Sequence, residues 1–218
     1  MSALSINQLS LAYQPQVPIF NDLSFHVEQG QKVLVTGLSG TGKSSFLHAI
    51  TGCIPNHIKA KVSGDILLFD KPIQSYPLEQ RIQTINIIFQ QPHWQFVSLT
   101  VLDELAFGLG SLNVPKAQMI NEINEIIDQL GLNACKDMKL HQCSLGQQQV
   151  IACASILLLK PKILCMDEAL SAVESSWKKQ VLSVIQHKVK TLVIVDHQPD
   201  YHQVTHHLSL SKGVLELV

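Results

Sequence analysis

Short apolar runs alternate with helical patterns along the chain, and glycine-containing turns separate several of them. Residues 4–13 and 23–27 alternate between apolar and polar positions, which predicts strands. The tail, residues 208–217, is expected to form a hairpin that turns at residues 212–213. Further apolar runs are expected to be strands at residues 32–35, 65–69, 85–89, 163–166 and 192–195. The last two are continuous, as in parallel strands buried on both faces.

The pattern is helical between residues 100 and 159. Apolar residues recur there at three- and four-residue spacing, after Pro115 and before Gly131: Met119, Ile120, Ile123, Ile126, Ile127 and Leu130. Three consecutive glutamines, residues 147–149, are expected to form a short polar face where a helix begins. Because strands and helices alternate on both sides, the sequence predicts an α/β core that contains a helical insert.

The composition fits one folded domain, with 218 residues of which 46% are hydrophobic. The net charge of -1, without a long basic block, gives no reason to expect a nucleic-acid partner. The five cysteines contain no CxxC pair, which indicates reduced thiols in the cytosol. The longest apolar stretch, residues 150–159, has half of the roughly twenty residues that a membrane span needs, and no signal peptide is visible. We therefore expect a cytoplasmic protein that does not itself cross the membrane.

The apolar run at residues 32–35 leads into a glycine-rich loop and then into a helix expected at residues 44–51. The loop matches the full GxxxxGK[ST] pattern with Gly37, Leu38, Ser39, Gly40, Thr41, Gly42, Lys43 and Ser44. Glycines let backbone N–H groups point at phosphate oxygens, and the helix N-terminus adds positive potential. Lys43 is expected to reach the β- and γ-phosphates, and Ser44 to bind Mg²⁺. The pattern, with Ser45 directly after it, predicts an ATP site.

A second pattern, at residues 163–168, is an apolar strand that ends in Asp167 and Glu168. Ligands of parallel sheets bind at the carboxyl ends of the strands. Asp167 is expected to hold the Mg²⁺ shell, and Glu168 to orient or deprotonate an attacking water. A solvated turn after a strand has the same letters, so the functional interpretation depends on the phosphate loop.

Five further markers resemble the ATP-binding cassette (ABC) ATPases, and the resemblance covers nearly the whole chain. Gln90 stands at that family's glutamine between the core and the helical subdomain, and Tyr13 at the aromatic residue that stacks on adenine. Residues 144–147 (SLGQ) fall in the place of the LSGGQ signature, and residues 171–174 (SAVE) in that of the SALD loop. His197 ends a late strand where the family has its switch histidine.

The resemblance implies a P-loop NTPase fold, with a RecA-like core of mostly parallel strands and an N-terminal antiparallel β-subdomain. Residues 1–90 and 148–218 would form the nucleotide-binding core of this single domain, and residues 91–147 the inserted ABC helical subdomain. Two such domains close head to tail in the family, and each signature touches the γ-phosphate held by the opposite loop.

The resemblance also implies roles for the site residues. The expected catalytic residues are Glu168 as general base, His197, Lys43 and Gln90. The expected nucleotide contacts outside the phosphate loop are Tyr13, Ser45, Ser144, Gly146 and Gln147. The expected Mg²⁺ ligands are Ser44, Gln90 and Asp167.

Two stretches resemble the energy-coupling-factor (ECF) branch, which imports vitamins and transition metals. Residues 89–95 (FQQPHWQ), with 100–101 and 106–108, are similar to its FQNPDDQ, TV and AFG segments, and residues 52–57 (GCIPNH) to its GLIPH segment. The resemblance implies an ATP-hydrolysing subunit on the inner face of the cell membrane. Membrane subunits are expected to dock on the helical subdomain near Gln90.

The chain departs from the family pattern at Leu145, in place of the first signature glycine, at Val150, in place of an arginine, and at Glu174, in place of an aspartate. A Cβ at position 145 hinders close approach of the backbone to phosphate. We therefore expect a second, non-identical ATPase as partner, with a homodimer as the alternative. Two other functions stay open: a regulatory nucleotide-binding module with little turnover, and a soluble ABC protein outside transport.

Overall fold

The computed structural model describes residues 1–14, 17–196, 204–211 and 213–218. The chain forms two compact units. The core unit comprises Met1–Ile87, Lys162–Asp167 and Lys190–Val218. The helical unit comprises Ile88–Pro161 and Glu168–Val189. The subdomain division expected from the family resemblance stays a prediction.

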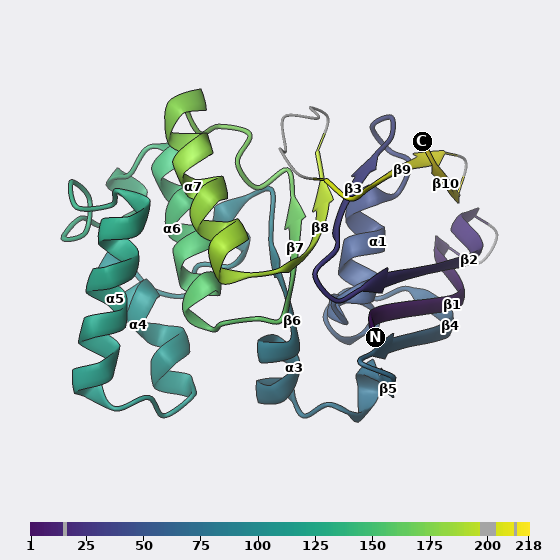
Figure 1. The fold of residues 1–218 in the computed structure, drawn as a ribbon, viewed down its shortest axis with the longest axis horizontal. Helices are drawn as coiled ribbons and strands as arrows, with labels where there is room; N and C mark the ends of the chain where they lie inside the picture. Colours follow the sequence, from purple (N-terminus) through teal and green to yellow (C-terminus); the bar gives the residue numbers. More distant parts are fainter. Residues whose placement is uncertain (15–16, 197–203, 212) are drawn as a thin grey trace. The chain divides into compact units, whose positions relative to one another are not determined.

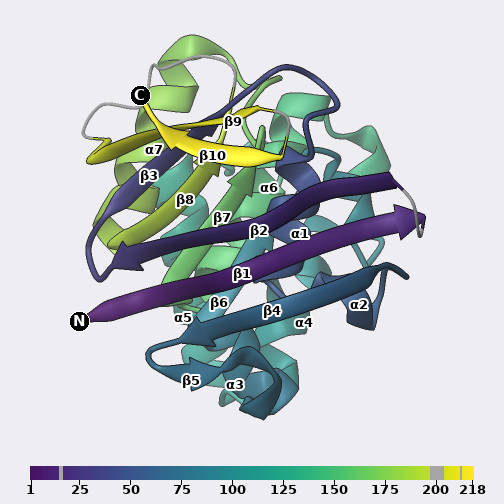
Figure 2. The ribbon, with the colours of Figure 1, turned by 90° about the vertical axis from the view of Figure 1, so that its right-hand side faces the viewer.

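An antiparallel sheet begins the core unit, as the resemblance implied. Its strands, in the order β2-β1-β4-β5, are β1 (Ser2–Gln14), β2 (Val17–Glu28), β4 (Lys61–Leu68) and β5 (Lys71–Pro72). Figure 2 shows β1 between β2 and β4. β2 is longer than the strand expected at residues 23–27, since the polar residues Asn21 and Asp22 interrupt its alternation. Asp22 has a φ of 54°, and its N–H donates to Ser10 Oγ over 2.9 Å, at a register shift between the strands.

The second sheet has the strand order β10-β9-β3-β8-β7-β6. Its strands are β3 (Lys32–Thr36), β6 (Ile85–Ile88), β7 (Ile163–Asp167), β8 (Thr191–Val195), β9 (His206–Ser211) and β10 (Val214–Leu217). β3 pairs in parallel with β8 and β9, and β7 pairs in parallel with β8. Every residue of β7 and β8 is buried, which confirms the expectation from their continuous apolar runs. The expected C-terminal hairpin is formed by β9 and β10, which pair antiparallel.

Helix α1 (Lys43–Ile50) begins directly after the loop that follows β3, and Figure 1 shows it beside that strand. Its N-cap, Gly42, has a φ of 97°, a left-handed conformation that glycine adopts without steric cost. Phe46, Leu47, Ala49 and Ile50 are fully buried and anchor the helix in the core unit. Shorter helices of this unit are α2 (Cys53–Asn56), η1 (Ile73–Ser75) and α3 (Leu78–Thr84).

The helical unit is organised around α6 (Leu145–Leu158). This helix packs against α4 (Val101–Ser111), α5 (Lys116–Leu130) and α7 (Ser175–Lys188), and the short turns of the unit are η2 (Pro92–Trp94) and η3 (Leu140–Gln142). Because other helices cover α6 on several sides, most of its apolar residues are buried in the core of this unit. Within the described ranges, no helix is both long and apolar enough to cross a membrane.

Helix α7 was not expected from the sequence. Its apolar signal consists of Trp177, Val181, Leu182 and Ile185 between polar residues, so the pattern is short. The helix also satisfies backbone carbonyls at the C-terminus of α5, where Trp177 Nε1 donates to Leu130 O over 2.7 Å and Gln180 Nε2 donates to Gln129 O over 2.9 Å. Contacts with another helix therefore determine much of its stability.

Candidate functional site

In the phosphate loop of the core unit, a lysine and a threonine donate hydrogen bonds to backbone carbonyls of the loop itself. The buried Lys43 donates from Nζ to the carbonyls of Gly37, over 2.8 Å, and Leu38, over 3.0 Å. The N–H and the hydroxyl of Thr41 both donate to the Leu38 carbonyl. The ammonium group therefore lies against the loop backbone, where a phosphate bound by this loop would meet it.

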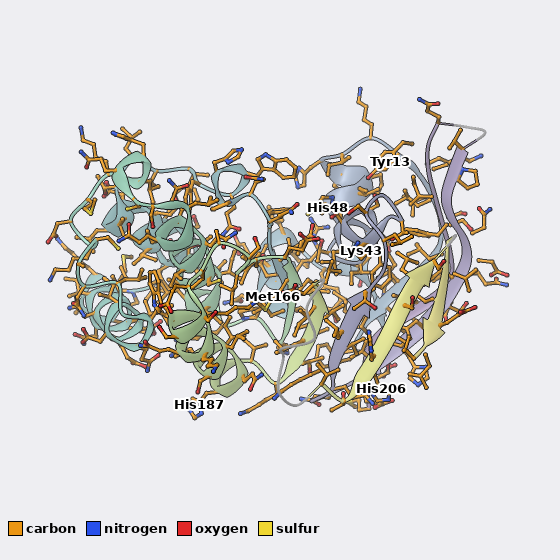
Figure 3. All side chains as sticks on the ribbon, turned by 90° about the horizontal axis from the view of Figure 1, so that it is seen from above. Tyr13, Lys43, His48, Met166, His187 and His206 are labelled. Carbon is orange, nitrogen blue, oxygen red and sulfur yellow. The ribbon has the colours of Figure 1, made fainter. Side chains whose placement is uncertain are left out.

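Tyr13, near the end of β1, reaches the first turn of α1. Its hydroxyl donates to Ser45 Oγ over 3.0 Å, and its side chain is exposed. Figure 3 shows Tyr13 and Lys43 beside the same helix. The structure thus brings together an aromatic ring and the phosphate loop, which suits stacking on a nucleotide base.

Asp167 is the last residue of β7 and is buried. It pairs in register with Val195, the last residue of β8, so it lies at the carboxyl edge of the parallel strands. α1, whose second residue is Ser44, packs against β7. The core unit therefore contains both the hydroxyl and the carboxylate that the sequence predicts as Mg²⁺ ligands.

Glu168 begins the next segment of the helical unit in a strained conformation. Its φ of 46° lies in the left-handed region, which a non-glycine residue adopts at a cost. Gln90 Nε2 donates to Glu168 Oε2 over 2.8 Å, and the N–H of Ser171 donates to the Glu168 carbonyl over 3.2 Å. Strained residues concentrate at active sites, so this backbone supports the functional interpretation of Glu168.

The signature-like residues lie at the N-terminus of α6. Ser144 and Gln147 form a capping box: the Gln147 N–H donates to Ser144 Oγ, and the Ser144 N–H donates to Gln147 Oε1. The side chain of Leu145 is 50% exposed, so packing within this chain does not require it. A Cβ on Gly146 would lie 2.7 Å from the Ala172 carbonyl oxygen, and only glycine permits this approach. The helix start and residues 172–173 are therefore in close contact.

A protein-family model described as ABC transporter matches residues 20–171, which is more than half of the chain. This chain belongs to the ABC transporter ATPases. It is 34% identical over 203 residues to a Bacillus subtilis protein named as an HMP/thiamine import ATP-binding protein, covering 90% of this chain and 37% of that relative. It is 31% identical over 206 residues to an energy-coupling factor transporter ATP-binding protein of Leuconostoc mesenteroides, covering 92% of this chain and 74% of the relative.

The first relatives are longer proteins, and the chain spans only 37% and 42% of their lengths. Solved ABC structures share the fold. CbiO1 of Clostridium perfringens, part of the ABC transporter complex CbiONQ, aligns with a TM-score of 0.81 and 23% identity over 99% of this chain and 87% of its own. The dimeric bacterial ABC cassette MJ0796 aligns with a TM-score of 0.84 and 20% identity over 98% of this chain and 96% of its own. The expected ABC fold is thus confirmed.

Glu174, which stands in place of the aspartate of the ABC pattern, caps a helix in this chain. Glu174 is the N-cap of α7, and its carboxylate accepts hydrogen bonds from the N–H and the hydroxyl of Ser176. These bonds hold the pKa of the Glu174 carboxyl below its usual value. The Glu174 side chain thus stabilises the start of α7.

His197, the expected switch histidine, lies outside the described residues.

The expectation of a polar face at residues 147–149 is wrong for Gln149, which is 2% exposed. Its burial depends on the segment at residues 171–172, which no local pattern in α6 reveals.

Proposed function

We propose that this chain is the ATP-hydrolysing subunit of a membrane importer of the energy-coupling-factor type, with a vitamin or a transition-metal ion as cargo. The hydrolase part is supported chiefly by the Gln90–Glu168 pair, in which an amide binds the carboxylate of a residue with a strained backbone, directly after a buried aspartate. The importer part is supported by relatives named for thiamine import and for energy-coupling factor transport. Such a subunit lies on the cytoplasmic face of the membrane.

ATP binding begins at the phosphate loop. The backbone N–H groups of the loop and the N-terminus of α1 receive the β- and γ-phosphates. Lys43 Nζ exchanges its bonds to the Gly37 and Leu38 carbonyls for charge-assisted bonds to phosphate oxygens. Tyr13 stacks on the adenine.

Mg²⁺ would be held by oxygens only, which is the ligand type this hard cation prefers. The donors would be the Ser44 hydroxyl, the Asp167 carboxylate and the side-chain carbonyl of Gln90. When bound, Mg²⁺ neutralises charge on the β- and γ-phosphates.

Hydrolysis follows from attack of water on the γ-phosphorus. The bond between the γ-phosphorus and the β,γ-bridging oxygen breaks, ADP leaves, and the Glu168 carboxylate accepts a proton of the attacking water. The Gln90 amide occupies Oε2 of that carboxylate and so fixes its plane. His197 contacts the γ-phosphate, and the signature of a partner subunit closes the site.

A Glu168→Gln variant tests the hydrolase proposal. Loss of the base should slow phosphate release by at least about 100-fold, while the affinity for MgATP stays within a few-fold of wild type because the phosphate loop is untouched. The control is Glu125→Gln, which changes an exposed side chain on α5. Equal phosphate release from wild type and Glu168→Gln would remove the hydrolase proposal and leave the regulatory-module alternative.

The partner ATPase is proposed to be a different chain. Leu145 places a side chain where close backbone approach to a γ-phosphate is needed, so a homodimer would contain two weakened sites. In a heterodimer, the phosphate loop and Glu168 of this chain would be completed by a full signature from the partner. The exposure of Leu145 is consistent with a place at the interface, because its side chain can meet a partner subunit at the start of α6.

Membrane subunits are proposed to dock beside Gln90, on a groove lined by Phe96, Leu99 and Leu140 together with His93 and His141. Leu99 is 79% exposed, and Trp94 and Val97 are exposed as well, so this segment presents apolar side chains to solvent. The buried Glu104 carboxylate accepts the N–H groups of Val97, over 3.0 Å, and Ser98, over 2.9 Å. The segment is therefore held in a defined shape.

Affinity purification of the tagged chain from its own cells tests both partners. Wild type should bring down a membrane protein and a second ATPase. Leu99→Asp should lose the membrane protein and keep the ATPase, whereas Ile120→Asp on α5, at a side chain that is 49% exposed, should keep both. Retention of the membrane protein by Leu99→Asp contradicts docking at this groove. Full ATPase activity without a second ATPase contradicts the heterodimer.

A further inference from the structure

We propose that Gln149 is a positioning residue for the Glu168 carboxylate. It connects α6 by hydrogen bonds to the two segments that hold this carboxylate, one at Gln90 and one at Ser171 and Ala172. The inference rests on the proposed function, because it takes Glu168 as the base that activates water. Gln149 is five residues after Ser144, in the second turn of α6.

The buried Gln149 amide forms three hydrogen bonds with other residues. Its Nε2 donates to Ser171 Oγ over 3.2 Å and to the Gln90 carbonyl over 3.4 Å. Its Oε1 accepts the Ala172 N–H over 2.9 Å. A buried amide that lost these partners would leave unsatisfied groups on three separate residues.

These partners lie on both sides of the Gln90–Glu168 hydrogen bond. On one side, Gln149 binds the backbone of Gln90, whose own amide donates to Glu168 Oε2 over 2.8 Å. On the other side, it binds Ser171, whose N–H donates to the Glu168 carbonyl. Gln149 therefore fixes the donor and the acceptor of that bond relative to each other. A strained backbone such as that of Glu168 persists only where its surroundings determine it.

Gln149 also connects this arrangement to the signature-like residues. Gly146, one turn earlier on α6, lies so close to the Ala172 carbonyl that a Cβ would not fit. Gln149 binds the N–H of the same Ala172. Ser144 caps α6, and Gly146 and Gln149 belong to the same helix. A displacement of the signature-like residues would therefore also displace Gln149 and its hydrogen bonds to Gln90 and Ser171. The hydrogen bonds of Gln149 go to residues of the helical unit, so it should affect the rate of hydrolysis and leave nucleotide affinity unchanged.

Steady-state kinetics on the purified complex tests the inference with two substitutions at Gln149. Gln149→Leu removes all three bonds, and Gln149→Glu keeps the acceptor for Ala172 N–H. The control is Gln180→Leu on α7, which removes a glutamine-to-carbonyl bond at the end of α5 and none of the bonds to Gln90, Ser171 or Ala172. If a second ATPase co-purifies, its phosphate-loop lysine is changed to alanine in every arm, so that turnover reports the site of this chain.

Gln149→Leu should lower kcat by about 10- to 100-fold with KM for ATP within about twofold. Gln149→Glu should lie between Gln149→Leu and wild type, and Gln180→Leu should match wild type. Ser171→Ala, which removes one bond and leaves α6 intact, should lower kcat less than Gln149→Leu and provides the test if that variant does not fold.

Wild-type kcat in Gln149→Leu and Ser171→Ala, with turnover lost in Glu168→Gln, would overturn the inference and leave the proposed function intact. A parallel fall of kcat and of nucleotide binding with the folded fraction would mean a structural role alone, and would also overturn it. Wild-type turnover in Glu168→Gln would instead remove the proposed function itself.

Discussion

Two hydrogen bonds and a strained backbone conformation meet at Glu168. The amide of Gln90 binds Oε2, the N–H of Ser171 closes a turn on the carbonyl, and φ is 46°. Backbone strain of this type costs about 1–3 kcal/mol, so this conformation lowers the stability of the fold and is nevertheless retained. The buried Asp167 directly before it ends a strand, which leaves the two consecutive carboxylates in different surroundings. Different surroundings allow one to hold a cation and the other to take a proton.

Burial also decides the reactivity of the cysteines. It raises the pKa of Cys153 to about 12, and it raises the pKa of Cys165, which is equally buried. The thiolate is the reactive form, so both stay inert near pH 8. Iodoacetamide should label the half-buried Cys53 first in the folded chain, and all five cysteines after denaturation, by mass spectrometry of peptides. Rapid labelling of Cys153 in the folded chain would contradict its burial.

The same shift gives the stability a pH dependence. The folded-state pKa of Cys153 lies above the unfolded value of about 8.5, so the unfolded chain loses its proton first as the pH rises. The contribution is fully present below about pH 8.5 and decreases toward the folded value. Thermal unfolding should therefore occur at lower temperature near pH 10 than near pH 7.5, and Cys153→Ala should reduce the difference. An unchanged difference in that variant would assign it to other groups.

At the scale of elements, α7 is held by its caps and by α5. Glu174 caps its first turn, and Trp177 and Gln180 bind carbonyls at the end of α5. A change in α7 is therefore also a change in the support of α5.

Trp177→Phe should lower the free energy of unfolding by about 1 kcal/mol, because it leaves the Leu130 carbonyl without its donor. Urea unfolding followed by circular dichroism measures it. Trp94→Phe, at the other tryptophan, should stay within about 0.5 kcal/mol of wild type because that side chain is exposed. Equal effects of both changes would contradict the contact between α7 and α5.

The elements that the sequence predicts are those with a local cause. The phosphate loop, β7 and β8 were expected because glycine positions and continuous apolar runs determine them within a few residues. The start of β2 was missed because a bulge at Asp22 breaks its period. α7 and the role of Gln149 were missed because each depends on partners about twenty or more residues away. The letters of Gln147, Gln148 and Gln149 are the same, and only tertiary packing separates them.

At the scale of the whole molecule, the proposed chemistry draws on both compact units. The phosphate loop and Asp167 belong to the core unit, whereas Gln90, Glu168 and the signature-like residues belong to the helical unit. One of the points where the chain passes between the units falls between Asp167 and Glu168. These two carboxylates are thus joined by one peptide bond although they belong to different units. Partner subunits would act on the helical unit through the groove beside Gln90.

The proposed hydrolysis requires that the loop from Gly37 to Ser44 bind MgATP. Isothermal titration of the purified chain with MgATP up to millimolar concentration, beside a Lys43→Ala variant, measures this directly. We expect saturable binding by wild type and binding weaker by at least about tenfold, or 1.4 kcal/mol, in Lys43→Ala, with both chains folded by circular dichroism. No binding by wild type, or the same affinity in both chains, would contradict the account.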